Sequence, residues 1–330
     1  MWNKNLFFAI SAVIAGSLFP FFMPNYVLYL INLSAIATIG AIGLNILTGY
    51  TGLIAIGHGA FLGVGAYTAA ILYTKAGVPF WLTLPAAGLM TAFVGVFFGT
   101  PSLRLRGFYL AMATLAAQVI LEYIFKNWES LTDGVRGIPI NPPPSFLGMI
   151  LQGDIKFYFL TVGLAILGIL ISRNLFRTDT GRALIGIRDR DIAASIVGIN
   201  LFKYKLISFA ISSFYAGIAG ALLGYYMTII NAEGYGLSVS IDYVAMIIIG
   251  GLGTISGSVL GAAFVVLFPE IVDHGIQILA RYVPLEYTFA AFRQLVFGLL
   301  IILFLLFEPR GLSAILGRIL QKIRPKLVKG

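Results

Sequence analysis

The stretch YVLYLINLSAIATIGAIGLNILT, residues 26–48, decides the fold class, because it is almost continuously apolar and contains no charged side chain. A helix needs about 20 mostly apolar residues to cross a hydrocarbon core that is roughly 30 Å thick. Further stretches of this kind cover residues 5–22, 53–73, 79–100, 108–125, 157–175, 206–230 and 290–307. Because a bilayer cannot satisfy open strand edges or exposed backbone, all of these stretches are predicted to be transmembrane helices.

The composition agrees with a membrane domain from end to end. Of the 330 residues, 59% are hydrophobic and 11% are charged, whereas soluble domains usually carry about 25% charged residues. The polar stretches are too short to hold an independent core. Residues 1–330 are therefore predicted to form a single, all-α, polytopic transmembrane domain. The chain has no cysteine, which excludes a disulfide framework and thiolate chemistry.

The distribution of basic residues predicts the orientation. Segment 173–205, the turn 101–107 and the tail after Pro309 are rich in Lys and Arg, and such segments stay on the cytoplasmic side. Loop 126–156 is balanced in charge and loop 269–289 is net acidic, so both are predicted to lie outside. Both chain ends are then predicted to be cytoplasmic. The net charge of +9 is explained in the same way and does not indicate nucleic acid.

Glycines interrupt the apolar stretch 241–268. If the basic tail after the last span is cytoplasmic, the number of membrane crossings requires this stretch to begin and end outside. The stretch is therefore predicted to be a re-entrant helix pair or two short crossings, in addition to eight full spans. A second glycine cluster lies within residues 49–65. Non-helical backbone at membrane depth survives only where protein or a water-filled cavity shields it. Both breaks are therefore predicted to line a substrate pathway, with close helix packing through small residues as the alternative.

The candidate pathway residues lie in or beside these two breaks. They are Asn45, Thr48, Gly52, Gly57, His58, Gly250, Gly251, Gly253 and Thr254. His58 is the ionisable residue farthest from a span end, and an intramembrane ionisable group is a functional candidate by default. The alternative for His58 is a neutral imidazole that bonds to a backbone carbonyl at a helix break. The spans carry no mid-membrane carboxylate, which argues against a proton relay.

The loop 177–204, predicted to be cytoplasmic, contains the sequence GRALIGIRDRDIAASIVGIN at residues 181–200. Asp189 or Asp191 is predicted to cap a short helix, and Gly198 to end it in a left-handed conformation. The functional residues expected in this loop are Gly181, Arg182, Asp191, Ile192, Ala193, Ala194, Ile196, Val197, Gly198 and Asn200.

Four of these residues form an apolar stripe on the short helix. Ile192 lies over Ile196, and Ala193 over Val197, at the i,i+4 spacing of helical neighbours. An apolar stripe on a charged cytoplasmic loop indicates a surface for a partner. The alternative is a helix that lies on the lipid headgroups or against its own bundle.

This segment resembles the cytoplasmic coupling loop of ABC importer permeases, whose pattern is Glu-Ala-Ala, three further residues and Gly. Ala193, Ala194 and Gly198 match the pattern, whereas Ile192 stands at the acidic position and Asp191 lies one residue earlier. The run through Asn200, Phe202, Tyr204 and Lys205 is similar to the LivM type of branched-chain amino-acid permease. Further segments that resemble this family are residues 45–53, 57–61, 104–109, 134–138, 250–254 and 308–312.

The resemblance implies a multi-pass permease subunit of the cell inner membrane, which translocates branched-chain or related amino acids by alternating access. It also implies four kinds of partner: a homologous second permease subunit, two cytoplasmic ATPase subunits, an extracytoplasmic substrate-binding protein and membrane lipid. The chain has no G-x-x-x-x-G-K-[ST] run, so no nucleotide or other cofactor is expected on it, and ATP is used by its partners. No ligand spacing indicates a metal site, and no catalytic constellation indicates an enzyme.

Three alternatives stay open. Permeases for urea and short amides are similar throughout, so the substrate is not fixed by the resemblance. An ion-coupled secondary transporter is a second alternative, because unwound backbone carbonyls can hold Na⁺. The outer loop 126–156 is either a docking surface for the binding protein or an ordinary solvated loop.

Overall fold

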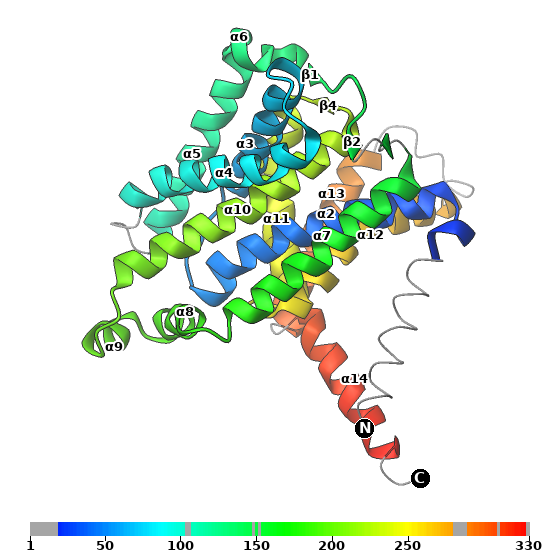
Figure 1. Cartoon of the computed structure of the whole chain (residues 1–330). Coiled ribbons are helices and arrows are strands. Elements are labelled where there is room, and N and C mark those ends of the chain that lie inside the picture. The colour runs from blue at the N-terminus through cyan, green and yellow to red at the C-terminus, as the bar shows by residue number, and fades with distance from the viewer. Residues whose placement is uncertain are drawn as a thin grey trace, which may run out of the picture.

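The computed structural model describes residues 19–102, 107–146, 149–150, 153–279, 289–308 and 311–327, and most of them are helical (Figure 1). The helices of ten residues or more are α2 (Asn25–Leu44), α3 (His58–Ala70), α4 (Phe80–Ser102), α5 (Phe108–Asn127), α7 (Asp154–Leu175), α8 (Asp179–Asp189), α10 (Leu201–Met227), α11 (Leu237–Gly250), α12 (Ile255–Leu279), α13 (Phe289–Phe307) and α14 (Gly311–Leu327). The predicted span 5–22 lies almost wholly outside the described residues, and so do Arg104, Arg106 and Arg310.

Shorter elements connect these helices. They are the π-helical segments η1 (Asn45–Tyr50) and η2 (Ile71–Lys75), the short helices α6 (Glu129–Thr132), η3 (Gly134–Arg136), α9 (Asp191–Ile196) and η4 (Ala232–Tyr235), and the strands β1 (Ile138–Pro139), β2 (Ser145–Phe146), β3 (Met149–Ile150) and β4 (Ile229–Ile230). β1 pairs with β4 and β2 with β3, each antiparallel. The β1–β4 pair fastens the loop after α5 to the end of α10.

Seven segments of the described part of the chain are long and apolar enough to cross a membrane. They are Asn25–Tyr50, Phe80–Pro101, Phe108–Asn127, Asp154–Leu175, Leu201–Met227, Ala232–Gly250 and Ile255–Asp273. The predicted spans 53–73 and 290–307 are helical but are not among the seven. The first becomes helical only at His58, and the second contributes the shorter apolar segment Leu295–Phe304.

The interrupted stretch 241–268 forms two helices rather than one. α11 and α12 have 14 and 25 residues, and the break between them covers residues 251–254. The segments Ala232–Gly250 and Ile255–Asp273 are each long and apolar enough to cross a membrane. α12 continues to Leu279, so the prediction of a loop over 269–289 is wrong for its first part.

Small residues hold α11 and α12 together. A Cβ atom on Gly250 would collide with the carbonyl oxygen of Gly257, and one on Gly261 with that of Met246. The two helices thus pack backbone against backbone, as small residues permit in membranes. Close helix packing, which is the alternative to a role in a substrate pathway, is sufficient to explain the glycine at Gly250.

α10 is the central helix, and it packs against α2, α3 and α4. Its side chain at Asn200 accepts a hydrogen bond from the Lys203 backbone N–H at 3.0 Å and so caps its first turn. A Cβ atom on Gly220 would collide with the carbonyl of Leu62 in α3, and one on Gly65 would collide with Gly217. These glycines allow α3 and α10 to cross at the distance of touching backbones.

The bundle has two opposite ends (Figure 1). α8, α9 and α14 lie at one end, which we call the α9 end. α6, β1 and β4 lie at the other, which we call the α6 end. Loop 177–204 and loop 126–156 therefore lie on opposite sides of the bundle, as the charge distribution predicts.

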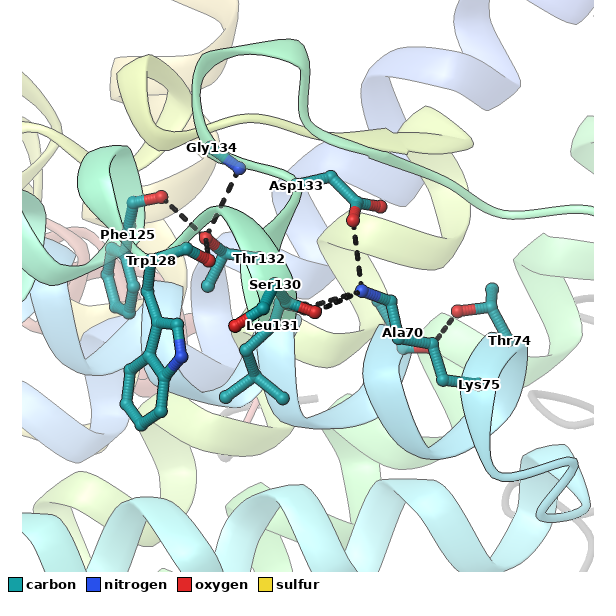
Figure 2. A network of polar contacts seen from close by, with 10 residues as sticks. All are labelled: Ala70, Thr74, Lys75, Phe125, Trp128, Ser130, Leu131, Thr132, Asp133 and Gly134. Carbon is teal, nitrogen blue, oxygen red and sulfur yellow. Dashed lines mark hydrogen bonds and ion pairs between the residues drawn. The ribbon is translucent and has the colours of Figure 1, made fainter.

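Lys75 ties the α6 end together (Figure 2). Its Nζ atom donates to Asp133 Oδ1 at 2.9 Å and to the carbonyls of Leu131 and Ser130 at 3.0 and 3.2 Å. The Thr132 hydroxyl lies 2.9 Å from the carbonyl oxygen of Phe125. The Lys75 ammonium group thus donates hydrogen bonds to backbone carbonyls near the C-terminal end of α6, where a positive charge is favourable.

Candidate functional site

Loop 177–204 is built from two helices, α8 and α9. The Thr178 side chain accepts a hydrogen bond from the Gly181 N–H at 3.4 Å and caps α8. α8 was not predicted from the sequence, although Thr178 followed by the apolar residues Ala183, Leu184 and Ile187, which are buried in the structure, is a pattern typical of a capped helix. The predicted short helix is confirmed as α9.

The predicted cap of α9 is wrong. Arg190 occupies the N-cap position, and no side chain caps the helix there. Asp191 is instead the first residue of the helix, where its negative charge interacts favourably with the positive end of the helix dipole. Gly198 follows the helix with a φ of +92°, and its N–H donates to the Ser195 carbonyl at 3.1 Å. The predicted left-handed exit at Gly198 is confirmed.

The apolar stripe of α9, which consists of Ile192, Ala193, Ile196 and Val197, is exposed. The exposed fractions of Ile192, Ile196 and Val197 are 68%, 80% and 83%. Ala194 differs, because it is 7% exposed and faces its own bundle. A helix with 3.6 residues per turn places Ala194 about 200° round from Ile192. Ala194, expected to be a functional residue of this loop, therefore does not lie on the exposed stripe.

Three other predicted loop residues make contacts within the loop or with the helix ends that border it. A Cβ atom on Gly181 would lie 2.5 Å from the Cα of Phe176, so only glycine fits there. Arg182 forms an exposed ion pair with Asp179, and Asn200 caps α10.

The structure brings together candidate pathway residues from both halves of the chain. Asn45 is buried, and its Nδ2 donates to the carbonyl of Thr254 and to Ser258 Oγ, both at 2.8 Å. Its Oδ1 accepts a hydrogen bond from the Gly253 N–H at 2.9 Å. We call Asn45, Gly253, Thr254 and Ser258 the Asn45 clamp. It joins η1 to the start of α12.

The start of α14 covers this break. A Cβ atom on Gly311 would lie 2.5 Å from the backbone nitrogen of Gly251. The Thr254 hydroxyl donates to Ser313 Oγ at 3.1 Å. Gly251 has a φ of +121°, a conformation that side-chain-bearing residues rarely adopt.

Thr48 lies in η1, and Gly52 lies in the turn that follows it. The Thr48 hydroxyl donates to the Leu53 carbonyl at 3.0 Å, and Gly52 has a φ of +75°. Gly52 belongs to a groove of about 260 Å³ at the α9 end. This groove is lined by Thr51, Gly52, Leu110, Arg188, Asp191 and Lys205, among others.

Gly57 and His58 belong to a separate cluster at the start of α3. His58 is buried, and its Nε2 lies 3.0 Å from the Gly40 carbonyl, which can only accept. Nε2 therefore carries the proton. A Cβ atom on Gly57 would collide with the carbonyl oxygen of Thr114. This geometry is the one expected if the His58 imidazole has a structural role and bonds to a backbone carbonyl at a helix break.

Two polar residues that were not predicted from the sequence accept hydrogen bonds from backbone N–H groups at the start of α3. Gln118 Oε1 accepts a hydrogen bond from the Ala60 N–H at 2.7 Å, and Ser240 Oγ accepts one from the Gly59 N–H at 2.7 Å. The Ser240 hydroxyl also donates to Gln118 Oε1 at 3.0 Å. Gln118 could have been identified as a polar residue in an apolar span, but no local sequence pattern indicated its partners. In the described ranges, no group of three or more His, Cys, Asp or Glu side chains could hold a metal ion.

An apolar helical bundle whose described part contains seven segments long and apolar enough to cross a membrane defines the class of multi-pass membrane proteins. Residues 26–305 match the family model described as "branched-chain amino acid transport system / permease component". The chain belongs to this family, and it is a multi-pass membrane protein.

The chain is similar to several curated members. It is 28% identical to the high-affinity branched-chain amino acid transport system permease protein LivM of Escherichia coli K12, over 94% of this chain and 75% of the relative. It is 26% identical to LivH of the same system and organism, over 84% of this chain and 90% of the relative. The probable LivM protein of Methanocaldococcus jannaschii is 26% identical over 70% of this chain and 67% of the relative. No solved structure matches the chain.

Proposed function

We propose that this chain is the membrane-spanning permease subunit of an ATP-driven importer for branched-chain or related amino acids in the cell inner membrane. It works with a homologous second permease subunit, two cytoplasmic ATPases and an extracytoplasmic binding protein. The family supports the permease role, and the similarity to both LivM and LivH supports a paired permease. The chain itself does no bond chemistry.

The exposed stripe of α9 carries the proposal of ATPase docking. Three large aliphatic side chains, Ile192, Ile196 and Val197, are mostly exposed on a loop that is otherwise charged. Such a patch indicates a partner surface. Ala194 is buried on the opposite side of α9, so the helix rests on its own chain while it presents the stripe to a partner. Coupling requires that the ATPases bind the two access states with different affinity.

The orientation follows from the two ends of the bundle. The α9 end is proposed to be cytoplasmic because loop 177–204 and the tail after Pro309 are basic. The α6 end is then outside and receives the binding protein. A groove of about 710 Å³ lies there, lined by charged and apolar residues that include Lys126, Glu129 and Val135.

The experiment is a charge substitution on the stripe. Ile196→Asp should weaken ATPase docking tenfold or more, because burying a polar group costs about 1–3 kcal/mol and 1.4 kcal/mol is tenfold in affinity. The matched control is Ser195→Asp, which places the same charge on an exposed position of α9 outside the stripe. The measurements are co-purification of the ATPases and substrate-stimulated ATP hydrolysis in reconstituted complexes.

Undiminished docking and coupling in Ile196→Asp would overturn the docking proposal. Transport that survives without any ATPase and follows an ion gradient would favour an ion-coupled secondary transporter instead. Ligand binding by the partner receptor separates branched-chain amino acids from urea and short amides.

A further inference from the structure

Arg188, in the last turn of α8, touches both glycine turns at the α9 end. A Cβ atom on Gly52 would lie 3.4 Å from Arg188 Cγ and 3.5 Å from its Cα. A Cβ atom on Gly253 would collide with Arg188 Nη1 and lie 3.4 Å from Cζ. The backbone of Gly52 therefore packs against the stem of this side chain, and the backbone of Gly253 against its guanidinium group.

The two turns come from distant parts of the chain, but each contains a glycine with a positive φ. Gly52 and Gly253 have φ values of +75° and +73°. Gly52 ends the helical segment that contains η1, and Gly253 lies in the break before α12. The Asn45 clamp joins the same two segments. One side chain of the coupling loop thus spans both helix breaks at the place where they are joined.

A second contact supports the same connection. The ring of Tyr50, the last residue of η1, stacks on Phe176 with centroids 3.6 Å apart and an interplanar angle of 17°. Phe176 directly precedes loop 177–204. The loop therefore meets the end of η1 at both ends of α8.

A solvated surface charge is the alternative for Arg188, since the residue as a whole is exposed. Arg190 and Lys205 line the same groove. Yet the three atoms nearest to a Cβ on Gly52 all belong to Arg188, and those nearest to one on Gly253 belong to Arg188 and Gly49. A guanidinium group has five N–H donors in a planar fork and stays charged, so it suits backbone carbonyls left at a helix break.

We propose that Arg188 is a positioning residue that transmits displacement of α9 to the glycine turns at Gly52 and Gly253, and thereby links ATPase movement to the substrate pathway predicted beside these turns. This inference rests on the proposed function. α8 is a helix of 11 residues that carries Arg188 in its last turn, and only Arg190 separates it from α9. Glycine lets both turns change their backbone angles without a Cβ obstacle. Coupling of this kind requires that Arg188 contact the turns differently in the two access states.

The test uses the complete reconstituted transporter with Arg188→Ala, Arg188→Lys and the matched control Arg190→Ala. In Arg188→Ala, the ATPases should co-purify normally, because the α9 stripe is untouched. ATP hydrolysis should continue without stimulation by the loaded binding protein, and transport per ATP should fall roughly 5- to 150-fold, the usual range of coupling between sites. Arg188→Lys keeps an aliphatic stem on Gly52 but loses the fork at Gly253, so its coupling should be intermediate. Arg190→Ala should behave as the unmodified protein.

A double-mutant cycle with Gly253→Ala checks the contact itself. The new Cβ atom meets the Arg188 guanidinium group, so the effects of Arg188→Ala and Gly253→Ala on coupling should be non-additive. Additive effects, or unchanged coupling in Arg188→Ala, would overturn the inference. An equal loss in Arg190→Ala would also overturn it, because a general charge effect would then suffice. Ile196→Asp keeps the two proposals apart: loss of docking there with intact coupling in Arg188→Ala refutes only the role of Arg188.

Discussion

Replacing Asn45 with alanine should loosen the junction between η1 and α12. The change removes three hydrogen bonds, two donated by Nδ2 and one accepted by Oδ1. Each such bond contributes about 0.5–1.5 kcal/mol net, and a buried group left without a partner costs about 1–3 kcal/mol. Because the Gly253 N–H is only partly buried, the expected loss in the free energy of unfolding is about 2–4 kcal/mol.

The assay is thermal unfolding of the purified permease complex in detergent, together with substrate uptake in proteoliposomes. Asn127→Ala is the matched control, because the Asn127 side chain is exposed and makes one hydrogen bond, to the Tyr123 carbonyl at 2.8 Å. That control should change stability by less than about 0.5 kcal/mol. Equal stability of the two variants would refute the clamp. Normal stability with abolished uptake would instead support the pathway role that the sequence predicts for Asn45.

Three further changes test other parts of the structure. Gly251→Leu forces leucine to a φ of +121°, which should cost about 1–3 kcal/mol of stability and lower uptake strongly; uptake at the normal rate would contradict this. Lys75→Met removes the ammonium group of Figure 2, and because the Asp133 ion pair is exposed it should cost less than about 1 kcal/mol. Hydrogen exchange at residues 129–137 should nevertheless become faster, and unchanged exchange would show that Lys75 does not hold this end. Asp273→Cys introduces a single thiol into a cysteine-free chain; a membrane-impermeant label should reach it from outside, and labelling only from the cytoplasm would refute the orientation.

The features predicted best from the sequence depend on local pattern. The helix over 26–48 and the short helix α9 follow from apolar runs and helical spacing, and the glycine break before α12 follows from the glycines themselves. The features that were missed depend on distant partners. The Asn45 clamp joins residues 208 positions apart, and no local pattern contains that information. The burial of Ala194 was not predicted, because a family pattern fixes residue identity, whereas the packing of the helix decides which face is covered.

The start of α3 has a consequence for biogenesis. The Ala60 N–H finds its partner 58 residues later in the chain, and the Gly59 N–H finds its partner 181 residues later. An unsatisfied backbone group in the bilayer costs several kcal/mol. A nascent chain that is inserted span by span therefore cannot complete α3 when α3 itself leaves the ribosome. Gln118 arrives with α5 and Ser240 with α11, so the native hydrogen bonds at the start of α3 form only after both helices have been synthesised.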